Sequence, residues 1–253
     1  MTAADGTTAP PPRRGRRLVR WGLGAVRPLL AWNYVAGAPT RMVAGIPDDT
    51  PNGLLDGPRV FNLLVVGGLS GSAVGVPSFR LGVAHQLAQE LHRRTGRGVE
   101  WESFAHPNMR LASTSEALQQ LPGLASYDLI VLSPGIADLL AFTPISAWRR
   151  EFERLVWHLD ATTADGVRLV VTEVPDVSAY VQVGPFVSGV LAQDSRELSS
   201  IAAEVCAGVP RAQYITLPPI EPSDFVDGAF SYSTLYRRWG HYLANQAVDL
   251  VDP

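Results

Sequence analysis

The sequence contains no lysine, and all 21 of its basic residues are arginine. This absence excludes a P-loop lysine, a Schiff-base lysine and the tyrosine–lysine pair of short-chain dehydrogenases. The only cysteine is Cys206, which excludes an internal disulfide framework and a cysteine-rich metal site. The histidines do not have the helical spacing of metal ligands, so we expect no metal. The sequence also lacks a loop suited to holding a coenzyme, so we expect no other cofactor.

The length and composition are those of a globular protein. The 253 residues suit one large domain or a domain with a tail, and 46% of them are hydrophobic. Charge is distributed unevenly: residues 1–45 contain seven arginines and one aspartate, a net charge of +6. Because the whole chain has a net charge of −3, the remainder carries −9, which argues against a nucleic-acid partner.

The N-terminal residues differ from the rest of the chain. Residues 1–12 are small, polar and proline-rich, which predicts disorder. Residues 13–32 combine arginines with a broken apolar run, and two interpretations stay open. The segment either lies on an anionic membrane surface or is a solvated arm whose apolar residues cover part of the domain. It is too short and broken for a membrane span and lacks a signal-peptide pattern, so we expect a cytoplasmic protein, peripheral to the membrane under the first interpretation.

The remaining sequence alternates short apolar runs with amphipathic helical patterns. Residues 46–58 are rich in proline, glycine and aspartate, which predicts a linker before a domain spanning residues 59–253. The alternation predicts the α/β class, a flavodoxin-like three-layer sandwich with a five-stranded parallel sheet. The predicted strands are 61–66, 99–104, 129–132, 167–171 and 214–217. Helices are predicted at 80–94, 148–159, 191–205 and 235–250. A further helix is predicted to begin at a capping box formed by Ser113 and Glu116.

In such a sheet a functional site lies at the carboxyl ends of the strands. The loop after the first predicted strand, Gly67 to Gly75, is rich in glycine and serine. It lacks the Gly-x-Gly-x-x-Gly pattern of dinucleotide loops, and its near match to the Gly-x-Ser-x-Gly nucleophile elbow ends in Ser72. This loop alone leaves open a nucleophile loop of the Gly-Asp-Ser-Leu type and a plain strand-to-helix turn.

Two further loops favour the first of these hypotheses. One runs from Leu132 to Asp138 after the third predicted strand, and the other contains Asp227-Gly228-Ala229-Phe230 before the last helix. Together with the order of strands, these pieces resemble the SGNH or GDSL hydrolases, a family of esterases and lipases, over residues 59–250. The resemblance also includes Gly75-Val76, Trp148-Arg149-Arg150, Val174-Pro175, Tyr236 and Trp239.

The resemblance implies a serine hydrolase site with four parts. In the family a serine attacks an ester carbonyl, and a histidine three residues after an aspartate acts as the base. The serine amide, a glycine amide and an asparagine side chain hold the oxyanion. Without gaps, this sequence has Leu69 at the serine position, whereas a shift of one residue puts Ser70 there. Both registers stay open, and the ungapped one keeps Gly75 aligned.

The other three blocks also depart from the family pattern. Asn108 stands where the second block has glycine, and the third block keeps Gly135 but has Ala137 in place of asparagine. In the fourth block Asp227 remains, while Phe230 occupies the histidine position. One missing oxyanion donor costs roughly 3–4 kcal/mol. Loss of the nucleophile together with the base removes the covalent route.

We therefore expect a catalytically degenerate SGNH-type protein, a pseudoenzyme that binds an acyl ester, lipid, glycan or partner protein. The alternative is an active ester hydrolase or acyltransferase that uses Ser70 and Asp227 with a relocated base. His106, on the loop after the second predicted strand, is the first base or pocket residue to consider. The acids Asp138 and Glu173 are interpreted as structural. So are the remaining histidines, His85, His92, His158 and His241, which fall within predicted helices.

Overall fold

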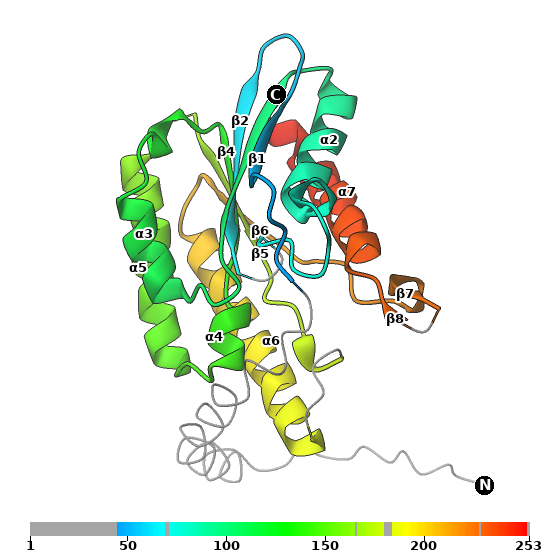
Figure 1. The fold of residues 1–253 in the computed structure, drawn as a ribbon. Coiled ribbons are helices and arrows are strands. Elements are labelled where there is room, and N and C mark those ends of the chain that lie inside the picture. Colours follow the sequence, from blue (N-terminus) through cyan, green and yellow to red (C-terminus); the bar gives the residue numbers. More distant parts are fainter. Residues whose placement is uncertain (1–44, 69–70, 165, 180–183, 228, 252–253) are drawn as a thin grey trace, which may run out of the picture.

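A computed structural model of the chain describes residues 45–68, 71–164, 166–179, 184–227 and 229–251 (Figure 1). The predictions for residues 1–44 lie outside the described residues and stay predictions. Among the described helices, none combines the length and apolar character that crossing a membrane requires.

All five predicted strands are present, and they form the parallel part of one sheet. The sheet has six strands in the order β1-β3-β2-β4-β5-β6. With β2 between β3 and β4, the five parallel strands follow the flavodoxin-like order. Their bounds are Phe61–Gly67 for β2, Val99–Ala105 for β3, Leu129–Ser133 for β4, Arg168–Thr172 for β5 and Ala212–Ile215 for β6.

The main sheet has one strand more than the five predicted. Residues 46–58, expected to be a linker, contain β1 (Asn52–Leu55), which pairs antiparallel with β3 at the edge of the sheet. Its four residues alternate between exposed and half-buried, so they lack the apolar run that marks the central strands. The strand exists because the outer edge of β3 offers unpaired backbone groups, which a local pattern cannot reveal.

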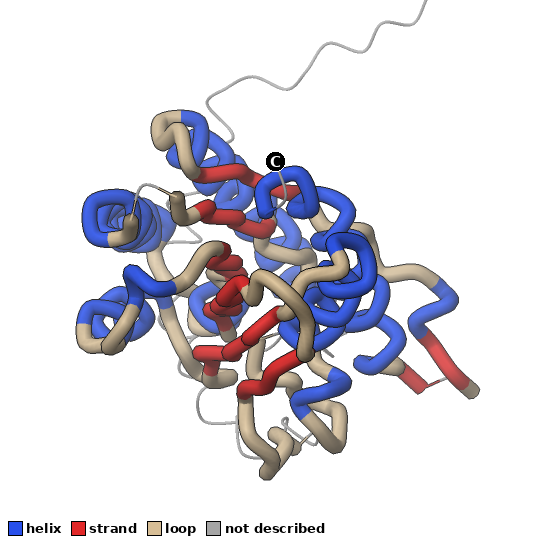
Figure 2. Tube along the Cα trace, turned by 90° about the horizontal axis from the view of Figure 1, so that it is seen from above, coloured by secondary structure: helices blue, strands red, loops and turns tan. Residues whose placement is uncertain are grey.

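Helices cover both faces of the sheet and make the predicted three layers (Figure 2). Alternate residues of each strand point to opposite faces. Thus Leu63 and Val65 pack on the layer of α2 and α7, whereas Leu64 and Val66 pack on the layer of α3 to α6. The first layer contains α2 (Val83–Thr95) and α7 (Tyr232–Val251). The second contains α3 (Leu111–Gln119), α4 (Ile136–Leu140), α5 (Ile145–Thr162) and α6 (Pro185–Ala207).

Shorter elements lie in the connections. Four 3₁₀ turns, η1 to η4, span Phe79–Leu81, Leu124–Ser126, Val177–Ala179 and Pro222–Asp224. Before α7 the chain forms a small antiparallel hairpin of β7 (Phe225–Val226) and β8 (Ala229–Phe230), which stands apart from the main sheet (Figure 1).

The predicted capping box is wrong. Ser113 lies inside α3, which begins at Leu111, and its Oγ donates to the Arg110 carbonyl at 2.8 Å. The amide of Leu111 donates instead to a carboxylate oxygen of Asp138 at 2.8 Å. The group that accepts from the first turn of α3 therefore comes from α4, which is distant in the sequence, and local spacing could not have identified it.

Candidate functional site

The candidate site lies at the carboxyl ends of β2, β3 and β4, where the matching loops meet. The first loop leaves β2 at Gly67; Leu69 and Ser70, the two candidate nucleophile positions, lie outside the described residues. Ser72 is 1% exposed, and both its amide and its Oγ donate to the Gly68 carbonyl, at 2.9 and 2.7 Å. This serine closes the turn and is therefore not available as a nucleophile.

The loop after β2 is held from both sides. On one side the buried Ser103 of β3 donates its Oγ to the Gly71 carbonyl at 2.6 Å. On the other side the Tyr236 hydroxyl of α7 donates to the Val74 carbonyl at 2.9 Å. The amino-acid pattern did not identify these two contacts as part of the site. They fix the backbone of this loop at Gly71 and at Val74.

The second loop, between β3 and α3, carries His106 and Asn108. Both side chains are exposed. The backbone amide of Asn108 donates to His106 Nδ1 at 3.2 Å. The loop faces the first one: a Cβ added to Gly68 would lie 3.9 Å from the carbonyl oxygens of both Pro107 and Met109. His106 thus lies on a loop that borders the Gly68 turn.

The third loop, after β4, is built around Gly135, which is buried and has a φ of 97°. A Cβ there would lie 2.7 Å from Val174 Cγ2, so both conformation and space require glycine. Ala137, at the position of the family's asparagine, is half-buried and has no side-chain donor to offer an oxyanion.

Asp138 joins the third loop to the second. It is 3% exposed and accepts from the Leu111 amide at 2.8 Å and from Thr143 Oγ1 at 3.0 Å. Burial raises the pKa of this carboxyl above its ordinary value, although both hydrogen bonds oppose that rise. These contacts support the structural interpretation of Asp138. Glu173, the other acid considered, is half-buried, and burial likewise raises its pKa.

The first three loops converge, as the order of strands predicted. Gly68, Met109 and Gly135 line a common cavity of about 10 Å³, which is room for about one water molecule. The other residues around it are Gly67, Leu111, Thr114, Leu132, Ser133 and Pro134.

The fourth block lies in the β7–β8 hairpin. Asp227 occupies the turn between Val226 and Ala229, is exposed, and has a φ of 51°. Asp-Gly is a preferred pair for a two-residue hairpin turn, which gives Asp227 a conformational role. Phe230, at the histidine position, packs edge-on against Phe225 and Tyr232, with ring centroids 5.4 and 4.9 Å apart.

Phe230 does not border the small cavity described above. It lines a separate open groove with Gly45–Asp48, Gly75–Pro77 and Tyr232. The loops after β2, β3 and β4 therefore meet at the small cavity, whereas Phe230 of the fourth block lines the separate groove together with the far end of the Gly67–Gly75 loop.

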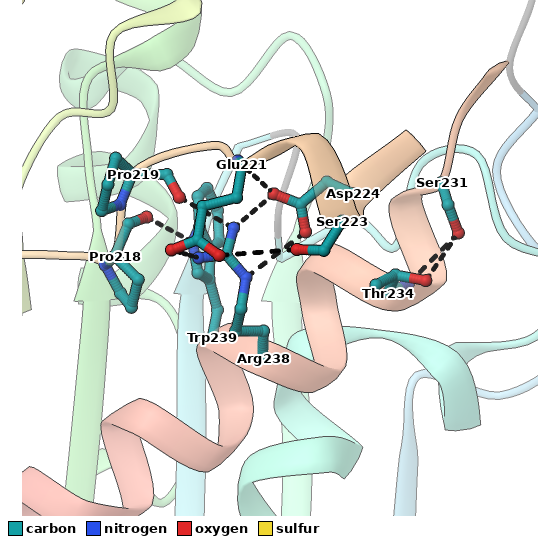
Figure 3. Close-up of polar contacts among 9 residues, drawn as sticks. All are labelled: Pro218, Pro219, Glu221, Ser223, Asp224, Ser231, Thr234, Arg238 and Trp239. Atoms are coloured by element: carbon teal, nitrogen blue, oxygen red, sulfur yellow. Dashed lines mark hydrogen bonds and ion pairs between the residues drawn. The ribbon is translucent and has the colours of Figure 1, made fainter. Parts of the chain in front are cut away.

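The sequence did not identify the buried acid of this region, Asp224. It is fully buried and forms an ion pair with Arg238 of α7, while its Oδ2 accepts from the Glu221 amide at 2.8 Å (Figure 3). Arg238 also donates to the Pro219 carbonyl at 2.8 Å, and Trp239 Nε1 donates to the Pro218 carbonyl at 3.1 Å. The signal was the spacing of Glu221 and Asp224, which form a capping box around η4.

Four of the five histidines lie on helices, as predicted. His85 packs edge-on against Trp101, and His92 Nδ1 lies 2.6 Å from the Arg97 carbonyl. His241 Nε2 lies 4.0 Å from a carboxylate oxygen of Glu90, and His158 is part of α5. Within the described ranges no cluster of three or more histidine, cysteine, aspartate or glutamate side chains could hold a metal ion.

The strand order and the helices on both faces of the sheet give the fold of the SGNH/GDSL hydrolases, and solved structures show the same fold. The chain is similar to Est24, a carbohydrate acetylesterase from Sinorhizobium meliloti, with 16% identity and a TM-score of 0.56 over 75% of this chain and 99% of that one. It is similar to TesA, with 16% identity and a TM-score of 0.54 over 76% and 98%. A G-D-S-L family protein from Desulfitobacterium hafniense has 7% identity and a TM-score of 0.53 over 73% and 98%.

At these identities the likeness establishes the fold alone. No family model matches the chain, and a comparison with curated proteins finds no match in sequence. The strand order, the parallel sheet and the convergence of the loops after β2, β3 and β4 agree with the resemblance seen in the sequence.

Proposed function

We propose that this chain is a catalytically degenerate SGNH-type protein that binds its ligand without hydrolysing it. The observation that carries the proposal is the fourth block. The Phe230 ring packs between two other aromatic rings, and Asp227 is exposed at the hairpin turn. A phenyl ring cannot accept the proton that the serine hydroxyl must lose, so the family's base is missing.

The oxyanion side of the site supports the same proposal. Ala137 offers no donor, and the asparagine of the second loop, Asn108, is exposed. The missing donor alone would cost about 3–4 kcal/mol of transition-state stabilisation. Combined with the loss of the base, this leaves binding as the function that the remaining groups can support.

We infer that the ligand class is an acyl ester, a lipid or a glycan. Est24, which shares the fold, is a carbohydrate acetylesterase, and this supports acetylated sugars as the first ligands to test. A ligand that binds only the native state at 100 times its Kd stabilises the protein by about 2.7 kcal/mol. We expect thermal unfolding of the full chain to shift upward with an acetylated monosaccharide and not with the free sugar.

One observation favours a second candidate function, an active hydrolase or acyltransferase that uses Ser70. His106 has an exposed imidazole on the loop that borders Gly68, the place where a relocated base would be needed.

Hydrolysis of p-nitrophenyl acetate and butyrate by the purified full chain separates the two functions. We expect no turnover above background under conditions in which Est24 is active. Turnover that disappears in both Ser70→Ala and His106→Ala, and persists in the matched control His158→Ala, would establish the enzyme instead.

We also propose that residues 13–32 hold the protein at anionic membranes. Each surface arginine contributes about 1 kcal/mol of attraction to an anionic leaflet. Replacing Arg13, Arg14, Arg16 and Arg17 with glutamine should therefore weaken sedimentation with phosphatidylglycerol vesicles, and salt should weaken that of the unmodified chain. Equal sedimentation of the two proteins would contradict the proposal.

A further inference from the structure

The second loop contains a tight turn over residues 106–109. The Met109 amide donates to the His106 carbonyl at 2.8 Å, which closes a β-turn with Pro107 and Asn108 at its centre. Pro107 is buried, and Met109 is half-buried and lines the small cavity, so two residues of the turn are anchored in the domain. The exposed side chains of His106 and Asn108 are therefore carried by a well-held backbone.

The His106 imidazole accepts the second amide of this turn. The backbone amide of Asn108 donates to His106 Nδ1 at 3.2 Å. A ring nitrogen that accepts a hydrogen bond carries no proton, so the proton of the neutral ring is on Nε2. If Nδ1 carried that proton, two N–H groups would face each other across the same distance. The turn thus favours one tautomer of the neutral ring, the one protonated on Nε2.

This tautomer decides which chemistry His106 can perform. The lone pair of Nδ1 is engaged by the Asn108 amide, and the protonated Nε2 has no lone pair with which to take a proton from a hydroxyl group. Nε2 lies across the ring from Nδ1, so its N–H points away from the turn backbone. An imidazole held in this way can donate a hydrogen bond to an oxygen atom, but it is not poised to act as a base.

The turn lies beside the first loop, at the end of the sheet where ligands bind in this class of fold. A Cβ on Gly68 would lie 3.9 Å from the carbonyl oxygens of both Pro107 and Met109. Ligands of parallel α/β sheets bind outside the carboxyl ends of the strands. The exposed His106 follows β3 at that end and is next to the loop that follows β2.

His92 shows the opposite arrangement in the same protein. Its Nδ1 lies 2.6 Å from the Arg97 carbonyl oxygen, which can only accept a hydrogen bond. Nδ1 of His92 must therefore carry a proton. The two histidines differ because one ring faces a backbone donor and the other faces a backbone acceptor.

We propose that His106 serves the site as a hydrogen-bond donor, through Nε2–H, to a carbonyl or hydroxyl oxygen of the ligand, and that it is not a relocated base. This inference rests on the proposed function, binding without hydrolysis. It narrows the ligand to a molecule that presents an acceptor oxygen to the second loop, such as the ester carbonyl of an acetylated sugar.

Nitrogen-15 spectra of the histidine rings in the full chain test the tautomer directly. They are recorded at mildly alkaline pH, where model imidazoles are neutral. We expect the proton of His106 on Nε2 and that of His92 on Nδ1, so the two rings serve as controls for each other. The His106 signals are identified by their loss in His106→Gln. A proton on Nδ1 of His106 would overturn the proposal, whether or not a ligand binds.

Two amide variants then separate a donor from a base. Glutamine places its side-chain NH₂ group near the position of Nε2, whereas asparagine places it near Nδ1, and neither amide is a base. The affinity for an acetylated monosaccharide is measured from the thermal unfolding of each full-length variant. We expect His106→Gln to stay within about threefold of the unmodified chain and His106→Asn to bind about tenfold more weakly, the effect of one hydrogen bond. The control His158→Gln, on α5, should bind like the unmodified chain.

The other outcomes contradict specific parts of the proposal. Equal affinities of His106→Gln and His106→Asn would exclude the donor role. Hydrolysis of p-nitrophenyl acetate by the unmodified chain that disappears in His106→Gln would make His106 a base. If the acetylated sugar fails to stabilise the unmodified chain, the proposed function fails for this ligand and the ligand contact fails with it. The nitrogen-15 spectra still decide, in that case, whether His106 is held as a donor.

Discussion

Replacing Asp224 with asparagine tests the ion pair that anchors the chain before α7. Removing one partner of a fully buried pair costs about 3–5 kcal/mol, because the other charge stays buried without compensation. The Arg238 side chain retains 23% exposure and also donates to the Pro219 carbonyl. We therefore expect Asp224→Asn to lower the free energy of unfolding by about 2–3 kcal/mol, below the fully buried case.

The matched control is Asp227→Asn, three residues further along. Asp227 is exposed with a φ of 51°, a conformation that asparagine also tolerates. Its replacement should change stability by less than about 0.5 kcal/mol. Urea unfolding followed by tryptophan fluorescence should show a midpoint lowered by about 1 M for Asp224→Asn alone, with an unchanged slope. Equal midpoints for the two variants would refute the assignment of Asp224 as the structural acid.

Three further predictions concern the site and the acid stability of the domain. Gly135→Ala places a Cβ 2.7 Å from a valine methyl at a φ of 97°, so calorimetry should show a loss of about 2–4 kcal/mol; an unchanged melting temperature would disprove the close contact. Leu69→Ser combined with Phe230→His should produce slow ester hydrolysis, limited by Ala137, that neither single change produces; activity in the Phe230→His variant alone would favour the shifted register. Hydrogen bonds from arginine lower the pKa of Glu90 from 4.5 to about 2, so this contribution to stability is present above pH 4.5 and lost as the pH falls toward 2. Urea midpoints of Glu90→Gln should accordingly depend less on pH across that interval than those of the unmodified chain.

The core strands could be predicted because burial on both faces leaves a continuous apolar run. Phe61 to Val66 and Leu129 to Leu132 show this pattern, and the structure confirms both as neighbouring parallel strands. The helices α2 and α7 were equally visible from their apolar faces. Such patterns miss a strand that forms only because it pairs with the edge of a neighbouring strand. Asn52–Leu55 has no pattern of its own and exists as β1 by pairing with the edge of β3.

The sequence by itself determined which groups the site lacks, because a missing histidine or asparagine is a matter of residue identity. Tertiary structure decided what the remaining groups do. It made Asp227 an exposed turn residue and Asp224 the buried partner of Arg238, although both acids lie in the same short stretch. It also joined Asp138 to the Leu111 amide across 27 residues of sequence. The physical reason is that burial and hydrogen-bond partners are set by elements distant in the chain, whereas residue type and hydrophobic period are local properties.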